Sequence, residues 1–269
     1  MPPPLARSRR APATGPERVI LRGVHPVVSA LAARMDDVLR ALDASGDPAR
    51  FFLGTYLRTT EAIGIALDAG LFEDGEWVAR WGVDFAELYL DALDAHRSDP
   101  ASPAAPWRLA FGADPGLPLE AHVLLGMNAH INFDLPQSLL RVIRPGDFAD
   151  RGLLARRERD HERIDDVLAA QVSTEDVALE RAGGRRTLLD RVLAPANRRA
   201  SRLFLRESRR KVWANTLALH LARLQGPADL AVCLADLEAA SAARVADLLR
   251  PGPVLLRLAV HGFGVRLPA

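Results

Sequence analysis

The sequence has almost no cysteine, almost no lysine and no long apolar run. Cys233 is the only cysteine among 269 residues, so an internal disulfide is impossible and a structural zinc site built from cysteines is excluded. Every basic residue except Lys211 is arginine. Apolar runs are broken before they reach the roughly 18 residues that suggest a membrane span. These absences favour a chain that stays out of the bilayer, and a cytoplasmic location is the default expectation.

The overall charge gives no sign of an anionic partner. The formal net charge is +1, with 26% charged and 49% hydrophobic residues, which is ordinary for a globular protein. Residues 181–211 are locally basic, with ten arginines and Lys211 against only Asp190 and Glu207. Aromatic residues do not alternate with these arginines as they do in many nucleic-acid-binding surfaces, so we interpret the segment as a solvated helix face. No nucleic-acid partner is therefore expected.

The hydrophobic periodicity is helical almost throughout and predicts an all-α, single-domain, multi-helix bundle. Residues 1–17 are rich in proline, arginine and alanine and are expected to form a disordered tail, with residues 18–269 as one helical domain. A proline-rich loop is expected from Ser98 to Pro118. Helices are predicted for His25–Leu42, Pro48–Gly70, 75–96, 119–135, Leu153–Leu168, a short stretch after Ser173, Ala196–Leu224 and Ala228–Leu249. The apolar end, Val254–Val265, is predicted to dock on the core as a strand or a helix.

The stretch Leu119–Pro136 is apolar enough to be buried, yet it carries two histidines, two asparagines and an aspartate. Buried polar groups are costly unless they are paired or used. One stripe of this predicted central helix has a spacing of four residues and consists of His122, Gly126, His130 and Asp134. Asn128 and Asn132 form a second stripe, and Gly126 leaves a notch for a ligand or a neighbouring backbone. Pro136 is expected to end or kink the helix.

Histidine and carboxylate four residues apart on a helix present two metal ligands from one rigid element. His130 and Asp134 have this spacing, and so do His161 and Asp165 farther along the chain. If the two helices face each other, His122, His130, Asp134 and His161 are candidate ligands for zinc, manganese or iron. Asp165 is then a further ligand or a catalytic base. Such a metal would activate water, which predicts a hydrolase or a lyase acting on a small or lipid-like substrate.

Two other hypotheses explain the same residues. In the first, His130 is a general base oriented by Asp134 without any metal, as in a small-molecule cyclase or isomerase. In the second, the polar stripes only fix the core of a non-catalytic binding or scaffold protein. Under the metal-dependent hypothesis Asn128 and Asn132 orient the substrate or the groups that hold the metal ligands. Tyr56 and Thr59 are expected beside the central helix as hydrogen-bond donors in a pocket, and these four residues are the candidate substrate-binding set.

The residues also resemble a known pattern. The core Gly-x-Asn-Ala-His-Ile-Asn-x-Asp-Leu at Gly126–Leu135 is similar to the signature of an uncharacterised, largely actinobacterial family, a domain of unknown function. Tyr56-x-x-Thr59 upstream and Asp160–Asp165 downstream fit the same family, over roughly residues 25–225. The resemblance implies an all-helical fold in which these positions belong together, and it implies no particular activity.

Overall fold

The computed structural model describes residues 25–181, 198–252, 257–258 and 262–267. The expected N-terminal tail and residues 182–197 of the arginine-rich segment lie outside this range. The described residues form helices and contain no β-strand, which confirms the all-α fold. None of the helices in these ranges is long and apolar enough to cross a membrane.

The helices follow the predicted pattern with small shifts at their ends. Their bounds are α1 (Pro26–Ser45), α2 (Ala49–Asp68), α3 (Gly75–Ser98), α4 (Ala105–Phe111), α5 (Leu119–Ala129), the π-helical segment η1 (His130–Asp134), α6 (Leu135–Val142), the 3-10 turn η2 (Pro145–Phe148), α7 (Arg151–Arg181), α9 (Arg198–Gln225) and α10 (Pro227–Leu249).

Local signals explain where several helices begin and end. Gly46 follows α1 with a φ of 71°, a left-handed conformation that glycine adopts without strain. The Asp47 carboxylate accepts a hydrogen bond from the Ala49 amide at the start of α2. Asp74 caps α3 by accepting from the Trp77 amide at 3.0 Å. These caps satisfy amides that have no partner within their own helix.

Two expectations about helix boundaries were wrong. The segment Ser98–Pro118 is not a continuous loop, because it contains the short helix α4 with Pro106 in its first turn. Proline is tolerated there because its missing N–H would have no helical partner in any case. The second error concerns α7, which continues through Ser173 to Arg181 where a separate short helix was expected.

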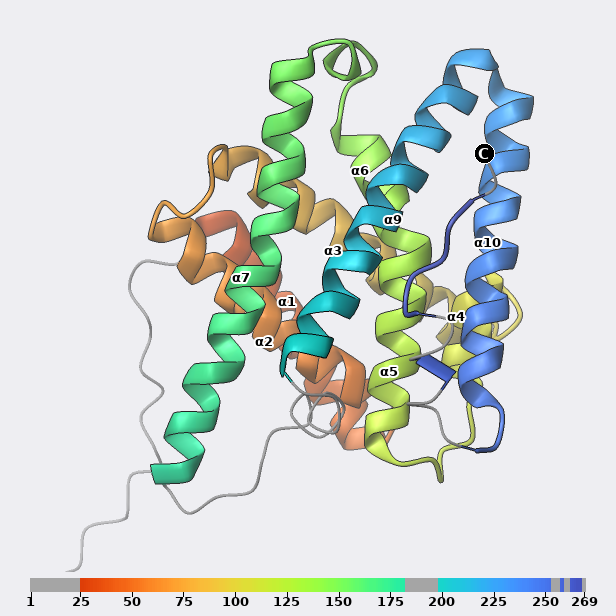
Figure 1. The fold of residues 1–269 in the computed structure, drawn as a ribbon. Coiled ribbons are helices and arrows are strands. Elements are labelled where there is room, and N and C mark those ends of the chain that lie inside the picture. Colours follow the sequence, from red (N-terminus) through yellow and green to blue (C-terminus); the bar gives the residue numbers. More distant parts are fainter. Residues whose placement is uncertain (1–24, 182–197, 253–256, 259–261, 268–269) are drawn as a thin grey trace, which may run out of the picture.

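The central helix consists of α5, η1 and α6, and it touches most of the other helices. Its α5 part packs against α2, α4 and α10, and α6 packs against α3 and α9. The segment η1 lies between them and contacts α3, α9 and α10. Figure 1 shows this unit between α1 and α2 on one side and α10 on the other, with α9 crossing in front of it. The predicted polar helix therefore lies at the middle of the fold.

Three adjoining apolar clusters surround the central helix. The first joins α1, α2, α3, α4 and α5 and includes Phe52, Tyr89 and Trp107. The second joins α3, α6, α7 and α9 around Trp81 and Trp213. The third combines α6, α9 and α10 with Val265 and Leu267 from the C-terminal segment. The predicted docking of the C-terminal end is thus confirmed for its described part, although no regular strand forms.

Candidate functional site

The candidate site begins with a change of helical winding at His130–Asp134. The Leu135 amide donates to the His130 carbonyl, five residues back, which is the hydrogen bond of a π-helix. Pro136 follows in the first turn of α6, so the winding continues through the proline instead of ending there. The Gln137 side chain donates to the Phe133 carbonyl at 2.8 Å. Short π-helical segments are rare and often occur at functional sites.

His130 and Asp134 form a buried pair within this segment. The His130 Nδ1 atom lies 2.8 Å from Asp134 Oδ2, and the two residues are 3% and 2% exposed. The indole Nε1 of Trp107 donates to the same carboxylate oxygen at 2.9 Å. When the Asp134 carboxylate is ionised it accepts both hydrogen bonds, which places a hydrogen on Nδ1 and leaves Nε2 as the basic nitrogen. Nε2 is buried and has no hydrogen-bond partner among the described residues.

Aromatic rings enclose the imidazole of His130. Phe85 stacks on it with ring centroids 3.6 Å apart, and Tyr56 meets it edge-on at 4.7 Å. Three further rings lie with centroids at about 6 Å from the His130 ring, namely Phe52, Tyr89 and Trp107. The Tyr89 hydroxyl is also buried without a partner in the described part of the chain. The site is therefore a buried aromatic enclosure in which two polar atoms have no hydrogen-bond partner among the described residues.

Burial sets the protonation of this pair. Desolvation lowers the pKa of His130, and the hydrogen bond with Asp134 opposes that shift only in part. Desolvation raises the pKa of Asp134, against the hydrogen bonds from His130 and Trp107. It also raises the pKa of Tyr56, and the charge of Asp134 raises it further. The imidazole is thus held neutral at pH 7, which is the form that accepts a proton.

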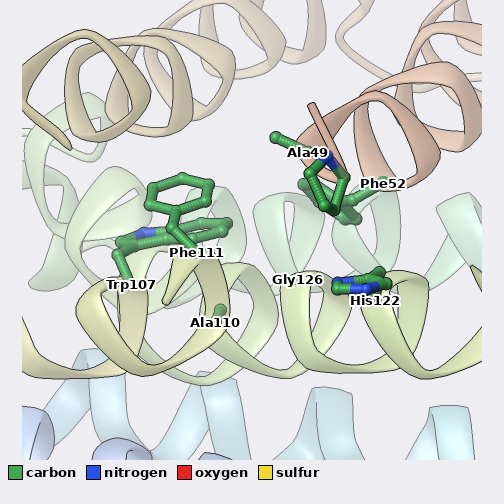
Figure 2. A pocket seen from close by; sticks show the side chains of 8 residues that line it. Ala49, Phe52, Trp107, Ala110, Phe111, His122 and Gly126 are labelled. Atoms are coloured by element: carbon green, nitrogen blue, oxygen red, sulfur yellow. The ribbon is translucent and has the colours of Figure 1, made fainter. Parts of the chain in front are cut away.

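A small pocket lies between the start of α2, α4 and α5, beside the enclosure. Figure 2 shows its lining side chains, with His122 and Phe52 on one side and Trp107 and Phe111 on the other. Two of these side chains, Phe52 and Trp107, also contact the His130 ring, so they separate the pocket from the buried pair. The pocket therefore lies next to the His130 enclosure, behind these two rings.

Gly126 explains why Phe52 can lie there. A Cβ atom at residue 126 would come within 2.5 Å of the Phe52 ring. The notch predicted at this glycine is therefore filled by the Phe52 side chain, not by a backbone segment. The close approach of α2 to α5 depends on this absent side chain.

His122 lines the same pocket and does not reach the His130 pair. It lies two helical turns earlier, beside Phe51, and its Nε2 atom has no partner in the described residues. Burial lowers the pKa of His122 as well. His122 is thus placed to contact a pocket ligand, and it is separate from the imidazole and carboxylate of the central pair.

His161 and Asp165 lie on α7, and only the His161 ring contacts the second apolar cluster. The His161 ring lies between Trp81 and Trp213, with centroids 5.5 and 5.6 Å away. Asp165 forms an ion pair with Arg209, which also donates to the His161 carbonyl at 3.0 Å. The predicted approach of the His161–Asp165 pair to the His130–Asp134 pair is not observed. Within the ranges described above, no group of three or more histidine, cysteine or acidic side chains is arranged to hold a metal ion.

The two asparagines of the central helix bind the chain itself. Asn128 and Asn132 both donate to the Phe263 carbonyl, at 3.2 and 3.1 Å, and Asn132 accepts from the Val265 amide at 3.1 Å. Their amides are therefore engaged by the C-terminal segment in this structure, not by an open pocket. The role predicted for them in orienting a substrate has no geometric support here.

Tyr56 and Thr59 have different surroundings although they share a helix. Tyr56 is 8% exposed and packs on His130, in line with its predicted position beside the central helix. The Thr59 hydroxyl donates back to the Thr55 carbonyl of its own helix at 3.1 Å. Tyr56 therefore belongs to the site, whereas Thr59 satisfies its hydroxyl locally.

Sequence reasoning missed three contributors to these contacts. Trp107 lies in the segment expected to be a loop, but its indole N–H is a direct partner of Asp134. Phe85 provides the stacking surface for His130, and no local pattern distinguishes it from other core aromatics. Asn215 binds the C-terminal segment, and its position as an isolated amide among apolar residues of α9 was an available signal.

A model of a known protein family matches most of the chain. The model of a family described as "Family of unknown function (DUF5995)" matches residues 28–251, which include the central helix and the rings around His130. No curated protein and no solved structure matches the chain. Because the match covers most of the chain, this protein belongs to the DUF5995 family of unknown function.

Proposed function

We propose that the protein is a metal-free acid/base enzyme that isomerises or cyclises a small apolar molecule. One observation carries the proposal: the His130 Nε2 atom is buried, basic and without a partner in the described residues, while Asp134 holds the other ring nitrogen at 2.8 Å. A general base needs a fixed tautomer and a pKa that leaves it unprotonated at neutral pH. Burial lowers the pKa of His130, which keeps its imidazole unprotonated at neutral pH.

The proton transfer balances without a further reactant. His130 Nε2 takes a proton from a carbon or oxygen of the substrate, and Asp134 stabilises the imidazolium that results. Nε2 then returns the proton to a different atom of the same molecule, so the product is an isomer or a cyclised form. Trp107 keeps the Asp134 carboxylate in place through its indole N–H. The surrounding rings exclude water and favour an apolar substrate.

The small pocket beside the enclosure is the proposed entrance. His122 contributes a polar atom to its lining, and Phe52 closes its inner end toward His130. In this proposal the Phe52 ring moves aside when a substrate enters. The expected partner is therefore a small molecule. The expected location of the protein is the cytoplasm.

The metal-dependent hydrolase or lyase has less support in the geometry. His130 and Asp134 are hydrogen-bonded to each other, and His122 and His161 lie among other residues. A scaffold role without catalysis would assign the His130–Asp134 pair to packing alone, and the hydrogen bonds of Asn128 and Asn132 to the C-terminal segment fit that role. No contact among the described residues favours the metal-dependent alternative.

The proposal is tested by asking whether the protein catalyses the exchange of carbon-bound hydrogens of a small molecule for deuterium from the solvent. The protein is incubated in D2O with a panel of small apolar ketones and enones, and deuterium incorporation is followed by mass spectrometry. The wild type is expected to catalyse incorporation into at least one compound, and His130→Gln is expected to lose it. His220→Gln is the control, because His220 also stacks on a phenylalanine but lies elsewhere. Equal incorporation in His130→Gln and the wild type, or none with any compound, contradicts the proposal.

A further inference from the structure

The C-terminal segment Gly262–Leu267 lies in a groove whose polar walls are side chains of the central helix and α9. Figure 1 shows this segment in dark blue between α9 and α10. The groove is distinct from the pocket beside His130, and the inference drawn from it does not depend on the proposed reaction.

Two asparagines bind the segment's backbone in the same manner. Asn132 donates to the Phe263 carbonyl and accepts from the Val265 amide, both at 3.1 Å. Asn215 donates to the Val265 carbonyl at 3.1 Å and accepts from the Leu267 amide at 2.9 Å. A carboxamide that pairs with the C=O and N–H of alternate residues does what a neighbouring β-strand would do.

Further donors complete this recognition of the backbone. Asn128 adds a second hydrogen bond to the Phe263 carbonyl, and Lys211, the single lysine of the chain, donates to the Gly264 carbonyl at 3.0 Å. Hydrogen bonds to main-chain atoms do not depend on which side chains the bound segment carries. The groove therefore recognises an extended conformation.

The side chains of Phe263, Val265 and Leu267, at alternate positions, are buried. Arg266 between the last two is exposed, whereas Gly264 is buried. Val265 and Leu267 pack in the third apolar cluster with Leu140, Leu219 and Leu237. At Gly264 a Cβ atom would meet Lys211 Cδ at 2.9 Å and Ser208 Cα at 3.0 Å, so a larger residue there requires these neighbours to shift. The groove thus favours a segment with apolar residues at the positions of Phe263, Val265 and Leu267 and glycine at the position of Gly264.

The family model covers the residues that form the groove but does not cover the segment bound in it. The matched region, residues 28–251, contains Asn128, Asn132, Lys211 and Asn215, whereas the bound segment lies beyond it. We infer that this groove is a binding site for an extended peptide with apolar residues at alternate positions, and that the C-terminal segment occupies it as a tethered ligand. A peptide of matching pattern would bind in its place when the segment is released.

The main experiment opens the groove in the full-length chain. Val265→Pro removes the amide that Asn132 accepts from, and Leu267→Ser removes an apolar anchor. A fluorescent peptide with the sequence of residues 261–269 is then titrated and followed by anisotropy. Binding to the double variant is expected to be at least about tenfold tighter than to the wild type, because the tethered segment competes at a high effective concentration.

Two controls identify the contacts. A peptide with an N-methyl group at the position of Val265 lacks one hydrogen-bond donor and is expected to lose the binding. Adding Asn215→Leu to the double variant removes the second amide clamp and is expected to have the same effect. Failure of the peptide to bind a double variant that keeps its helical circular dichroism overturns the inference, and so does equal binding of the N-methylated peptide.

If the double variant does not fold, the exchange of backbone amide hydrogens in the wild type provides a second test. A tethered ligand requires that the Val265 and Leu267 amides be protected and that they exchange through an opening that leaves the central helix protected. Free exchange of these amides, or exchange only together with global unfolding, overturns the inference.

Discussion

The ring of His130 lies face to face on the ring of Phe85, with centroids 3.6 Å apart and planes 4° apart. His220 lies on Phe148 in nearly the same way, at 3.8 Å and 8°. The two histidines differ in their polar partners. His130 is paired with the buried Asp134 carboxylate, whereas His220 Nδ1 lies 2.8 Å from an Arg223 nitrogen. The second pair is therefore a matched control for the first.

His130→Ala is expected to destabilise the protein more than His220→Ala. The first change leaves the buried Asp134 carboxylate with the Trp107 indole as its remaining donor among the described residues. Losing a hydrogen bond to a buried charged group costs about 3 kcal/mol. The second change removes a stacking partner and one hydrogen bond, at about 1 kcal/mol. Urea denaturation of both variants measures the difference. Equal losses would mean that Asp134 does not depend on His130.

Trp107→Phe isolates the indole hydrogen bond to Asp134. Phenylalanine keeps a ring beside Phe111, on which Trp107 now stacks with centroids 4.9 Å apart, but it has no N–H to donate. The free energy of unfolding is expected to fall by about 1–3 kcal/mol. The proposed deuterium exchange should also slow, because the carboxylate that orients His130 loses a support. Unchanged stability would show that water replaces the indole as donor.

Gly126→Ala is expected to destabilise the protein although alanine is the better helix former. A Cβ atom at this position meets the Phe52 ring at 2.5 Å, and overpacking of this kind costs about 1–3 kcal/mol. Gly82→Ala in α3 is the control, because a Cβ there meets nothing within 4 Å. That change is expected to stabilise by up to about 1 kcal/mol. Thermal melts of the two variants should therefore shift in opposite directions.

The stability of the protein is expected to fall as the pH falls below 7. Burial is the largest cause of a lowered pKa at His122, His130, His161 and His220. The unfolded chain therefore takes up protons near pH 6.5 that the folded chain refuses, which favours unfolding by roughly 1 kcal/mol per strongly shifted histidine between pH 6.5 and 5.5.

His161→Phe tests the largest of these contributions. The ring lies between Trp81 and Trp213, and neither of its nitrogens has a hydrogen-bond partner in the described part of the chain, so phenylalanine suits the position. Denaturation at pH 7 and pH 5.5 should show a smaller loss for the variant than for the wild type. An equal loss would mean that His161 takes up its proton in the folded state.

Metal removal is expected to have no effect. The candidate ligands His122 and His161 lie apart from the His130–Asp134 pair, so the acid/base proposal needs no bound ion. Elemental analysis of the purified protein, with His130→Ala in parallel, should find zinc, manganese and iron far below one per chain, and chelation should leave the melting temperature unchanged. Stoichiometric metal that is present in the wild type and lost in His130→Ala would instead support the metal-dependent hydrolase hypothesis.

Much of the fold was predictable because helices depend on neighbours three and four residues apart. The apolar period and the Pro, Gly and Asp signals placed α1, α2, α3, α9 and α10 close to their observed bounds. The central polar helix and its His130–Asp134 pair were also predictable, since both partners lie on one element. The short helix α4 was missed because five prolines and two glycines in Ser98–Pro118 outweighed a weak helical pattern.

By itself, then, the sequence determined the helical class, the buried position of residues 119–135 and the spacing that joins His130 to Asp134. Only the tertiary structure decided that Trp107 donates to that carboxylate, that Phe85 stacks on the imidazole, and that the asparagines bind the C-terminal segment. Local spacing fixes which residues share a helix face. It does not fix which distant helix covers that face, because that choice depends on the packing of the whole chain.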